Sequence, residues 1–450
     1  MATVEQTFEE AVQEFFEKST DLLEQEAHEN FPPPPPAPYP QGGPPVFSGL
    51  RFDEDTIRNY AYSIGDDNPL YTDPEYARHS PYGTQIAPSP MLSIARYPSA
   101  HGADRPQGYP VANFISGAAW EFYDVIRVGS RFTTSKISKE SFEKSGAQGR
   151  LLFLISDVSY WDQTGELKAK CYGTQIHVPI RQMETGRAMP VERIGEHMMY
   201  SRGTQKYTDE QIAEIVEALN NQQRRGAEPR YWEDVEDGEE LPPFVLPPFS
   251  CQDQIVYHRI SYSLTAANDG ERNPQGFEPA YHRGKQRPDF VRTNPITRWP
   301  FSPGAEHEDA VLAIFRGQPG PFDFGVQRAQ IPQMLMTNWM GDMGFLRKMY
   351  TAFRRPVFYG DTTWYRGKVV RKYVATETGD ESEVGVPGEA RYHAVAIEIE
   401  GTNQAGEMQC PGFATVYLPS REHGPVQLPI PHPAKPPFVP YDTYRRVDWY

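Results

Sequence analysis

The sequence predicts an α+β fold in which one unit, a buried helix that leads into an antiparallel sheet, occurs twice in tandem. Two observations lead to this prediction. An apolar helical pattern near residue 340 runs directly into a segment with the composition of a strand, and two short turn motifs recur in the same order in each half of the chain. The 450 residues are sufficient for two or three domains with substantial cores.

The helix of the second unit is predicted from Gln330 to about Phe353. Its apolar residues recur at spacings of three, four and seven, and they cover so much of the circumference that we expect the helix to be buried. Pro356 ends the pattern. The β-branched and aromatic residues of 362–370 then predict a strand. The apolar positions of the predicted helix are Ile331, Met334, Leu335, Trp339, Phe345, Leu346 and Tyr350.

The first unit is predicted to extend from residue 52 to residue 180. A short helix is expected at 53–63, and a second begins at Asp73, where the aspartate is a suitable cap and Pro74 takes the first helical position. Strands are predicted at 118–128, 131–138, 151–161 and 166–178.

Two segments of the first unit recur in the second. Residues 124–133 resemble 355–364, and the Asp-Gln-Thr-Gly block at 162–165 matches Asn-Gln-Ala-Gly at 403–406. The offset grows from 231 (355 minus 124) to 241 (403 minus 162). One surface-loop insertion would produce this change, and the acidic stretch 377–388 is the candidate. Both blocks are typical of hairpin turns between strands.

The domain organisation follows from these units and from the segments that connect them. We expect an amphipathic helical arm and Pro-rich connector at 1–50, the first unit at 51–182, a helical linker at 183–229, the second unit at 230–421 and a Pro-rich tail at 422–450. The arm is expected either to dock a partner or to pack back on its own chain.

Charge and cysteine usage exclude several classes of function. The chain has 60 acidic and 44 basic residues, a net charge of -16, and such a surface is a poor partner for nucleic acid. It has no apolar run long enough to cross a membrane and no signal peptide, so we expect no membrane partner and a cytoplasmic location. Its 3 cysteines are widely spaced and predict reduced thiols and no metal site.

Residues 66–73, Asp-Asp-Asn-Pro-Leu-Tyr-Thr-Asp, resemble the Asp-x-Asn-Pro-x-His-x-Asp motif of the MaoC-like (R-specific) enoyl-thioester hydratases and dehydratases. Pro-Tyr-Gly at 81–83, Ile-Ala-Pro at 86–88 and the Gly-Ser turn at 129–130 follow in the order that this family uses. The resemblance implies a double hot-dog fold, in which each antiparallel sheet curls round a central helix. One half then performs the chemistry and the other shapes the acyl pocket.

The resemblance also implies catalytic residues. Asp66 falls on the family's aspartate and Asn68 on its asparagine, whereas Tyr71 stands where the family has histidine. Hydration of an enoyl thioester needs a group that takes a proton from water, a group that returns one to the α carbon, and a donor to the carbonyl. The ordinary pKa of tyrosine is about 10, against about 6.5 for histidine. Tyr71 is therefore expected to donate a hydrogen bond and to be a poor base.

Substrate-binding residues are expected in the second unit. Gln327 and Arg328 lie where the family places its carbonyl-binding amide, and Arg328 is expected to meet a coenzyme A phosphate or the thioester, or else to cap the helix. Asp342, inside the predicted helix, would need a hydrogen-bond partner if buried. Residues 268–274 hold a less complete version of the motif, followed by His282.

The sequence therefore predicts a hydratase or dehydratase that interconverts 2-enoyl and 3-hydroxyacyl-CoA thioesters, with coenzyme A as part of the substrate and no other cofactor. Fatty-acid or steroid side-chain metabolism is the expected context. The alternative is a non-catalytic acyl-CoA-binding subunit that pairs with a smaller hot-dog chain carrying the missing histidine. A homo-oligomer or such a hetero-oligomer is expected, and a thioesterase on the same fold is a third hypothesis.

Overall fold

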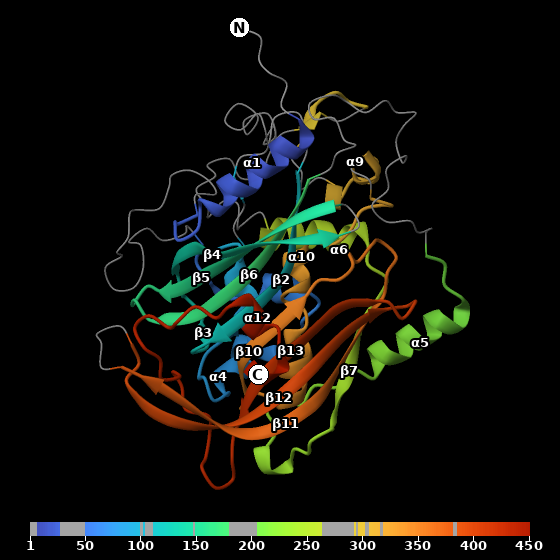
Figure 1. Cartoon of the computed structure of the whole chain (residues 1–450). Coiled ribbons are helices and arrows are strands. Elements are labelled where there is room, and N and C mark those ends of the chain that lie inside the picture. Colours follow the sequence, from blue (N-terminus) through green and yellow to red (C-terminus); the bar gives the residue numbers. More distant parts are fainter. Residues whose placement is uncertain are drawn as a thin grey trace.

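One antiparallel sheet runs through both halves of the chain (Figure 1). The computed structural model describes residues 7–27, 50–99, 102–103, 111–146, 149–179, 205–262, 292–293, 296–301, 306–315, 318–380 and 385–450. Within these ranges the large sheet has 9 strands in the order β4-β5-β6-β2-β10-β13-β12-β11-β7. The first half contributes β2 (Val111–Phe122), β4 (Phe132–Gly146), β5 (Gly149–Asp162) and β6 (Leu167–Pro179). The second contributes β7 (Glu240–Leu246), β10 (Phe345–Ala352), β11 (Thr363–Gly379), β12 (Gly388–Asn403) and β13 (Met408–Leu418).

The two halves meet where β2 pairs with β10, with Trp120 opposite Met349 and Ala118 opposite Thr351. Outward from this seam the order is β2, β6, β5, β4 on one side and β10, β13, β12, β11 on the other, with β7 added at the second edge. Equivalent strands therefore occupy equivalent places in the two halves. The predicted α+β fold of two tandem hot-dog units is confirmed.

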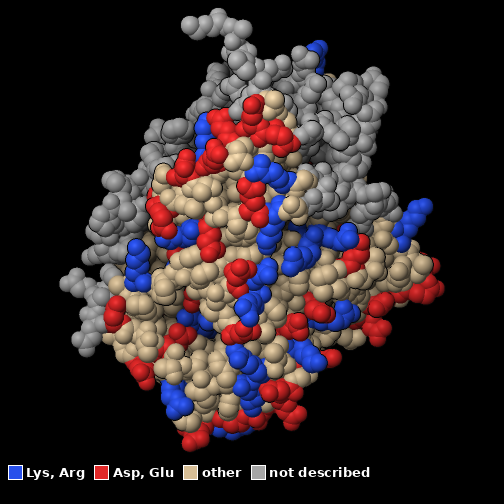
Figure 2. Space-filling view, viewed as in Figure 1, with Lys and Arg blue, Asp and Glu red and all other residues tan. Residues whose placement is uncertain are grey.

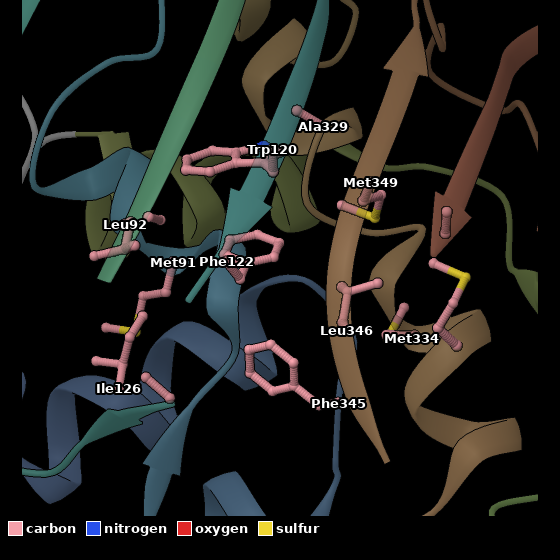
Figure 3. Packing of buried hydrophobic residues seen from close by; sticks show 14 of the residues in the cluster. Met91, Leu92, Trp120, Phe122, Ile126, Ala329, Met334, Phe345, Leu346 and Met349 are labelled. Carbon is pink, nitrogen blue, oxygen red and sulfur yellow. The ribbon is translucent and has the colours of Figure 1, made fainter. Parts of the chain in front are cut away.

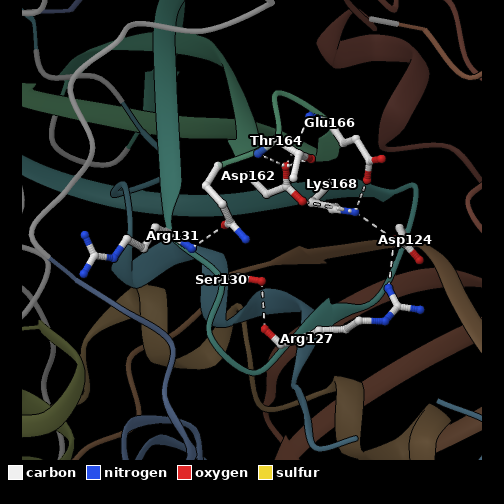
Figure 4. A network of polar contacts seen from close by, with 9 residues as sticks. Asp124, Arg127, Ser130, Arg131, Asp162, Thr164, Glu166 and Lys168 are labelled. Atoms are coloured by element: carbon white, nitrogen blue, oxygen red, sulfur yellow. Dashed lines mark hydrogen bonds and ion pairs between the residues drawn. The ribbon is translucent and has the colours of Figure 1, made fainter. Parts of the chain in front are cut away.

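The repeated turn motifs make the same contacts in both halves. Oδ1 of Asp162 and Oδ1 of Asn403 each accept two backbone N–H groups from the turn that follows. Figure 4 shows the turn of the first half, at Asp162. The donors are Thr164 (2.9 Å) and Glu166 (3.2 Å) in the first half, and Ala405 (3.0 Å) and Glu407 (2.9 Å) in the second. An aspartate or asparagine at this position fixes the turn by such bonds.

The next residue of each motif also has the same role. Oε1 of Gln163 accepts the N–H of Arg131 at 2.9 Å, and Oε1 of Gln404 accepts the N–H of Thr362 at 3.0 Å. Each of these bonds ties a hairpin turn to the residue before β4 or β11. The hairpin between β11 and β12 is the longer one, as the change of offset predicts, because residues 380–387 connect those strands and only 147–148 connect β4 with β5.

The prediction of one helix from residue 330 to 353 is wrong. The structure has two short helices, α10 (Gly325–Arg328) and α11 (Gln333–Met340), and the remainder is strand β10. The chain turns at Gly341, whose φ of 70° suits glycine and whose Cβ would lie 2.8 Å from the carbonyl oxygen of Glu228. Strand β10 is buried on both faces, so its apolar residues form a run that periodicity alone cannot distinguish from a buried helix.

Helix α11 lies on the concave face of the second half, packed against β7, β10, β11 and β13. In the first half, a 3-10 helix, η2 (Ser89–Ile94), contributes Met91, Leu92 and Ile94 to the same apolar core. Figure 3 shows the apolar core that joins them, with Trp120 and Met349 from the two sides of the seam and Met334 from α11. The helices α2 (Glu54–Ser63), α3 (Pro69–Thr72) and α4 (Pro74–Arg78) precede η2, and the short strands β1 (Ile86–Ala87) and β3 (Ile126–Arg127) pair with each other.

The tail packs on the sheet across the seam. It contains α12 (Tyr441–Tyr444) and the 3-10 turn η7 (Val447–Trp449). Tyr444 stacks on Tyr172 of β6 with the ring centroids 5.7 Å apart. On the other side of the seam, Nζ of Lys348 in β10 donates to the carbonyl of Trp449 at 2.9 Å. The tail therefore fastens both halves of the sheet.

Each edge of the large sheet is protected over part of its length. The described part of the arm, residues 7–27, packs back on its own chain through α1 (Phe8–Thr20), and the N–H groups of Glu24 and Ala27 donate to β4 carbonyls at 2.8 and 2.7 Å. At the other edge, β7 contains Pro242 and Pro243, which lack the N–H that a further strand would need. Such features hinder edge-to-edge pairing.

The remaining elements are α5 (Asp209–Asn220), η4 (Trp232–Asp234), α6 (Cys251–Tyr257), the π-helical η5 (His258–Tyr262), β8 (Arg292–Thr293), β9 (Pro300–Phe301) and α9 (Ala310–Phe315). Of these, α5 packs against β7 and η4 against β12, whereas α6 and η5 pack against α2 of the first half. The partial motif at 268–274 and His282 lie outside the described residues, as does the Pro-rich connector. Figure 2 shows acidic and basic side chains interspersed on the viewed face. Within the described ranges, no helix combines the length and the apolar character needed to cross a bilayer.

Gly412→Ala should destabilise the fold by about 1–3 kcal/mol or more, because an added Cβ would overpack the strand. That Cβ would lie 2.0 Å from the carbonyl oxygen of Tyr350, and its counterpart at Gly173 in β6 would lie 1.8 Å from that of Pro98. Urea unfolding measures the change. Gly320→Ala is the control, since nothing lies within 4 Å of its Cβ, and equal stability of the two variants would contradict the prediction.

Candidate active site

The motif loop, residues 66–73, connects α2 to α4. The N–H of Asp66 bonds to the carbonyl of Ala61 at 2.9 Å at the end of α2. Asn68 then caps α3 by accepting the N–H of Leu70 at 3.0 Å, and Pro69 takes the first helical position. Local sequence therefore fixes the path of the loop, and with it the direction of the Asp66 side chain.

The Asp66 carboxylate is buried, with 1% of the residue exposed, and it is bonded from both halves of the chain. Oδ1 accepts the N–H of Asn68 at 3.0 Å and lies 3.4 Å from Nη2 of Arg224. Oδ2 accepts Nε2 of Gln333 at 2.9 Å. Since Gln333 belongs to α11, the motif aspartate of the first half is held against the central helix of the second.

Burial raises the pKa of Asp66 to about 6, and the nearby Arg224 guanidinium and the bond from the Asn68 amide oppose that rise. At neutral pH the group is therefore mostly a carboxylate, yet it can accept a proton without a large penalty. A buried carboxyl group with a pKa near neutrality is suited to acid–base chemistry.

A small cavity lies at the seam between the halves, beside this carboxylate. Asn68 and Tyr71 line it from the first half, and Gln333, Thr337 and Asp342 line it from the second. About 30 Å³ is accessible to the centre of a water molecule, which is room for one or two waters. Asp66 does not line the cavity itself, but two of its hydrogen-bond partners, Asn68 and Gln333, do.

Asp342 is the second carboxyl group at the cavity. It lies just after α11, not within a helix as predicted, and 4% of it is exposed. The hydroxyl of Tyr76 donates to its Oδ2 at 2.6 Å, and its N–H donates to the carbonyl of Gly226 at 2.9 Å. Burial raises the pKa of Asp342, and the bond from Tyr76 and the charge of Arg224 limit the rise.

Tyr71 lines the cavity with 4% of its surface exposed. Burial raises the pKa of its phenol well above 10, and the charges of Asp66 and Asp342 act in the same direction. The group that replaces the motif histidine therefore stays protonated at neutral pH. It can donate a hydrogen bond, and it cannot serve as a base.

Comparison with known proteins agrees with this architecture. Residues 51–170 match the family described as "FAS1-like, dehydratase domain region". A solved structure described as a MaoC-like dehydratase aligns with 83% of this chain and 96% of its own, at 14% identity and a TM-score of 0.51. The chain therefore has a double hot-dog fold like that of this dehydratase structure.

Other structures with lower superposition scores carry similar descriptions. A MaoC domain protein dehydratase from Chloroflexus aurantiacus aligns over 84% of this chain and 95% of its own, at 12% identity and a TM-score of 0.44. A Mycobacterium tuberculosis protein described as having a double hotdog fold aligns over 82% and 93%, at 11% identity and a TM-score of 0.41. Among curated proteins, no sequence matches the chain.

The structure does not bring Gln327 and Arg328 to the cavity of this MaoC-like fold. Both lie in α10 and are buried. The Arg328 guanidinium forms a two-pronged ion pair with Asp323, with Nη2 2.9 Å from Oδ1, and it also donates to the carbonyl of Arg355. Its charge is thus neutralised inside the chain. The pairing of Arg328 with Asp323, five residues earlier, was not predicted from the sequence.

Three residues of the site, Gln333, Arg224 and Tyr76, were not predicted from the sequence. Gln333 carried a signal, because it is a polar residue in an otherwise apolar pattern. Arg224 carried a weaker one, as part of an Arg-Arg-Gly sequence at the end of the linker. Tyr76 carried none, since its bond to Asp342 joins residues 266 positions apart.

Metal ligands are not gathered in the part of the chain that the structure describes, where no three His, Cys, Asp or Glu side chains are close enough to hold an ion. The cysteines are free thiols, with Cys171 and Cys410 buried and Cys251 exposed. The polar side chains at the cavity carry carboxyl, amide, phenol and hydroxyl groups, and the chemistry assigned to this site is proton transfer and hydrogen bonding.

Proposed function

We propose that the chain adds water to a 2-enoyl thioester, or removes it from a 3-hydroxyacyl thioester, at the cavity between its two halves. The observation that supports this proposal most strongly is that one buried carboxyl group, Asp342, lines the cavity and a second, Asp66, bonds to two residues of its wall, Asn68 and Gln333. The pKa of each is raised by burial. Two carboxyl groups in different environments can divide the roles of acid and base.

In the hydration direction, Asp66 as carboxylate takes a proton from water while the water oxygen bonds to the β carbon. The electron pair of the double bond moves toward the thioester carbonyl, and the α carbon takes a proton from Asp342 in its protonated form, which burial favours. The phenol of Tyr71 donates to the carbonyl oxygen as enolate charge develops. To bind water directly, Asp66 must exchange the amide of Gln333 on Oδ2 for that water.

The carrier and setting belong to the same proposal. We assign coenzyme A as the carrier of the acyl group, no further cofactor, and the cytoplasm as the location. The cavity has room for water but not for an acyl chain. Entry of the thioester therefore requires apolar side chains at the cavity wall, such as Phe345 and Leu346, to change rotamer.

The purified chain alone should convert 2-enoyl-CoA into a product heavier by one water. The conjugated enoyl thioester absorbs in the ultraviolet, so its loss follows the reaction, and mass spectrometry identifies the product. A series of linear, branched and ring-bearing acyl groups then defines the acyl preference. Release of free thiol instead would identify a thioesterase, and no change with any member of the series would contradict the proposal.

A second candidate is favoured by the state of Tyr71. Because burial keeps this phenol protonated, the chain lacks a base at the position of the motif histidine. It would then be a subunit that binds the acyl-CoA and pairs with a smaller hot-dog chain that supplies the base. In that case the chain alone should bind acyl-CoA in calorimetry without turnover. Activity should appear only after the second chain is added, and it should not respond to Asp66→Asn.

A further inference from the structure

The end of the linker between the two halves forms part of the site. Nε of Arg224 donates to Oδ1 of Asn338 on α11 at 3.0 Å. Nη2 of the same guanidinium donates to Oδ1 of Asp67 at 2.6 Å and lies 3.4 Å from Oδ1 of Asp66. One side chain thus connects the motif loop of the first half to the central helix of the second.

The two residues that follow hold the linker in place. The N–H of Arg225 donates to the carbonyl of Asn338, and its Nε donates to that of Trp339, both at 2.9 Å, so Arg225 caps the end of α11. The carbonyl of Gly226 accepts the N–H of Asp342 at 2.9 Å. Residues 224–226 therefore contact the segments that carry both carboxyl groups.

We propose that Arg224 is a positioning residue that holds the Asp66 carboxylate beside the cavity and fixes the motif loop against the second half. This inference rests on the proposed function, because it assigns Arg224 to the same site. It gives the linker a role in the chemistry in addition to its role as a connection. The side chain of Arg224 is 20% exposed, so its charge acts on Asp66 with only partial screening by water.

The charged and titratable groups that face Asp66 come from several elements. They are Arg224 from the linker, Asp67 in the motif loop, Tyr60 on α2 and Tyr71 on α3, while the α11 neighbour Gln333 is neutral. Burial raises the pKa of both tyrosines far above neutrality. Arg224 is therefore the one cation among these groups, and its removal should make Asp66 harder to ionise.

Arg224→Gln should move the acid limb of the pH profile of kcat/KM upward by about one pH unit or more. Activity lost near pH 6.5 should be largely recovered near pH 9, which a merely structural defect would not produce. Arg224→Lys keeps the charge and loses the forked contact, so its acid limb should stay near that of the wild type. Arg225→Gln is the matched control: it weakens the cap of α11 and should lower stability without moving the limb.

A second measurement separates this inference from the proposed reaction. Carbon-13 labelling of the aspartate side chains, with Asp66→Asn to assign the signal, reports the titration of Asp66 by NMR even in a chain without turnover. A higher midpoint in Arg224→Gln supports the positioning role whether or not the chain is an enzyme. The same midpoint in the wild type and in Arg224→Gln would overturn it. If Arg224→Gln does not fold, an Arg224→Lys variant with a midpoint raised by a unit or more would equally overturn it.

Discussion

Asp66→Asn should reduce kcat/KM for the hydration of 2-enoyl-CoA by about 10²–10⁴-fold, the usual contribution of a general base. Asparagine has nearly the same shape and can still accept the N–H of Asn68, so the loop should keep its path. The wild-type rate should rise with pH through the pKa of Asp66, about 6, because the carboxylate is the active form. The residual rate of the variant should lack this dependence.

The same substitution should make the fold more stable above pH 6. The pKa of Asp66 in the folded chain, about 6, is higher than its ordinary value of 3.8, because burial disfavours the charge. The group therefore contributes stability that is fully present below pH 3.8 and is lost as the pH rises through about 6. The difference corresponds to about 3 kcal/mol at most.

Thermal unfolding at pH 5 and pH 8 tests this second effect. The variant should gain Tm relative to the wild type at pH 8, and less or nothing at pH 5. Asp67→Asn is the control, because the Asp67 carboxylate follows Asp66 in the sequence, is 74% exposed and also contacts Arg224. Loss of turnover in Asp67→Asn equal to that in Asp66→Asn, or unchanged turnover in Asp66→Asn, would rule out the proposed role of Asp66.

Arg347→Met should destabilise the chain by about 3–5 kcal/mol, the usual result when one member of a buried ion pair is removed. Arg347 lies in β10 at the seam with 3% of its surface exposed. Its guanidinium bonds both carboxylate oxygens of Glu377 at 2.7 and 3.1 Å, and lies 3.4 Å from Oε2 of Glu121 in β2. Methionine fills much of the space but leaves two acidic groups without their cation.

The loss should depend on pH. Burial would raise the pKa of Glu377, but the Arg347 charge outweighs this effect and lowers it. Without Arg347 the carboxyl group should protonate more readily, so the deficit of the variant should shrink as the pH falls. Urea unfolding between pH 5 and pH 8 measures this trend. Arg366→Met, an exposed arginine of β11, is the control and should change stability by less than about 0.5 kcal/mol.

The duplicated architecture could be predicted from the sequence because its evidence is local. Asp162 and Asn403 each bond to their own turn, so the residue types required at those positions recur wherever that turn recurs. The long helix was predicted wrongly because its second part, β10, is a strand covered on both faces. The Gly-Asp-Met-Gly sequence at 341–344, between two apolar stretches, marked the change.

The site could be predicted only in part, because only part of its evidence is local in the sequence. Asp66 and Asn68 belong to one short loop whose spacing is set by a cap and a turn. The partners of Asp66, Gln333 and Arg224, lie 267 and 158 positions from it in the sequence. Their contacts depend on how the two halves of the sheet join. A single sequence contains no pattern that specifies such a contact, although each residue is unusual for its surroundings.

The protected edges of the sheet constrain how this protein can recognise another. Backbone amides are identical in every chain, so an open edge would accept many extended segments with little discrimination. Here one border is occupied by residues 24–27 and the other carries two prolines. Along these stretches, association with a second chain, whether of this protein or a different one, would therefore depend on the chemistry of side chains, and its selectivity would be open to change by single substitutions there.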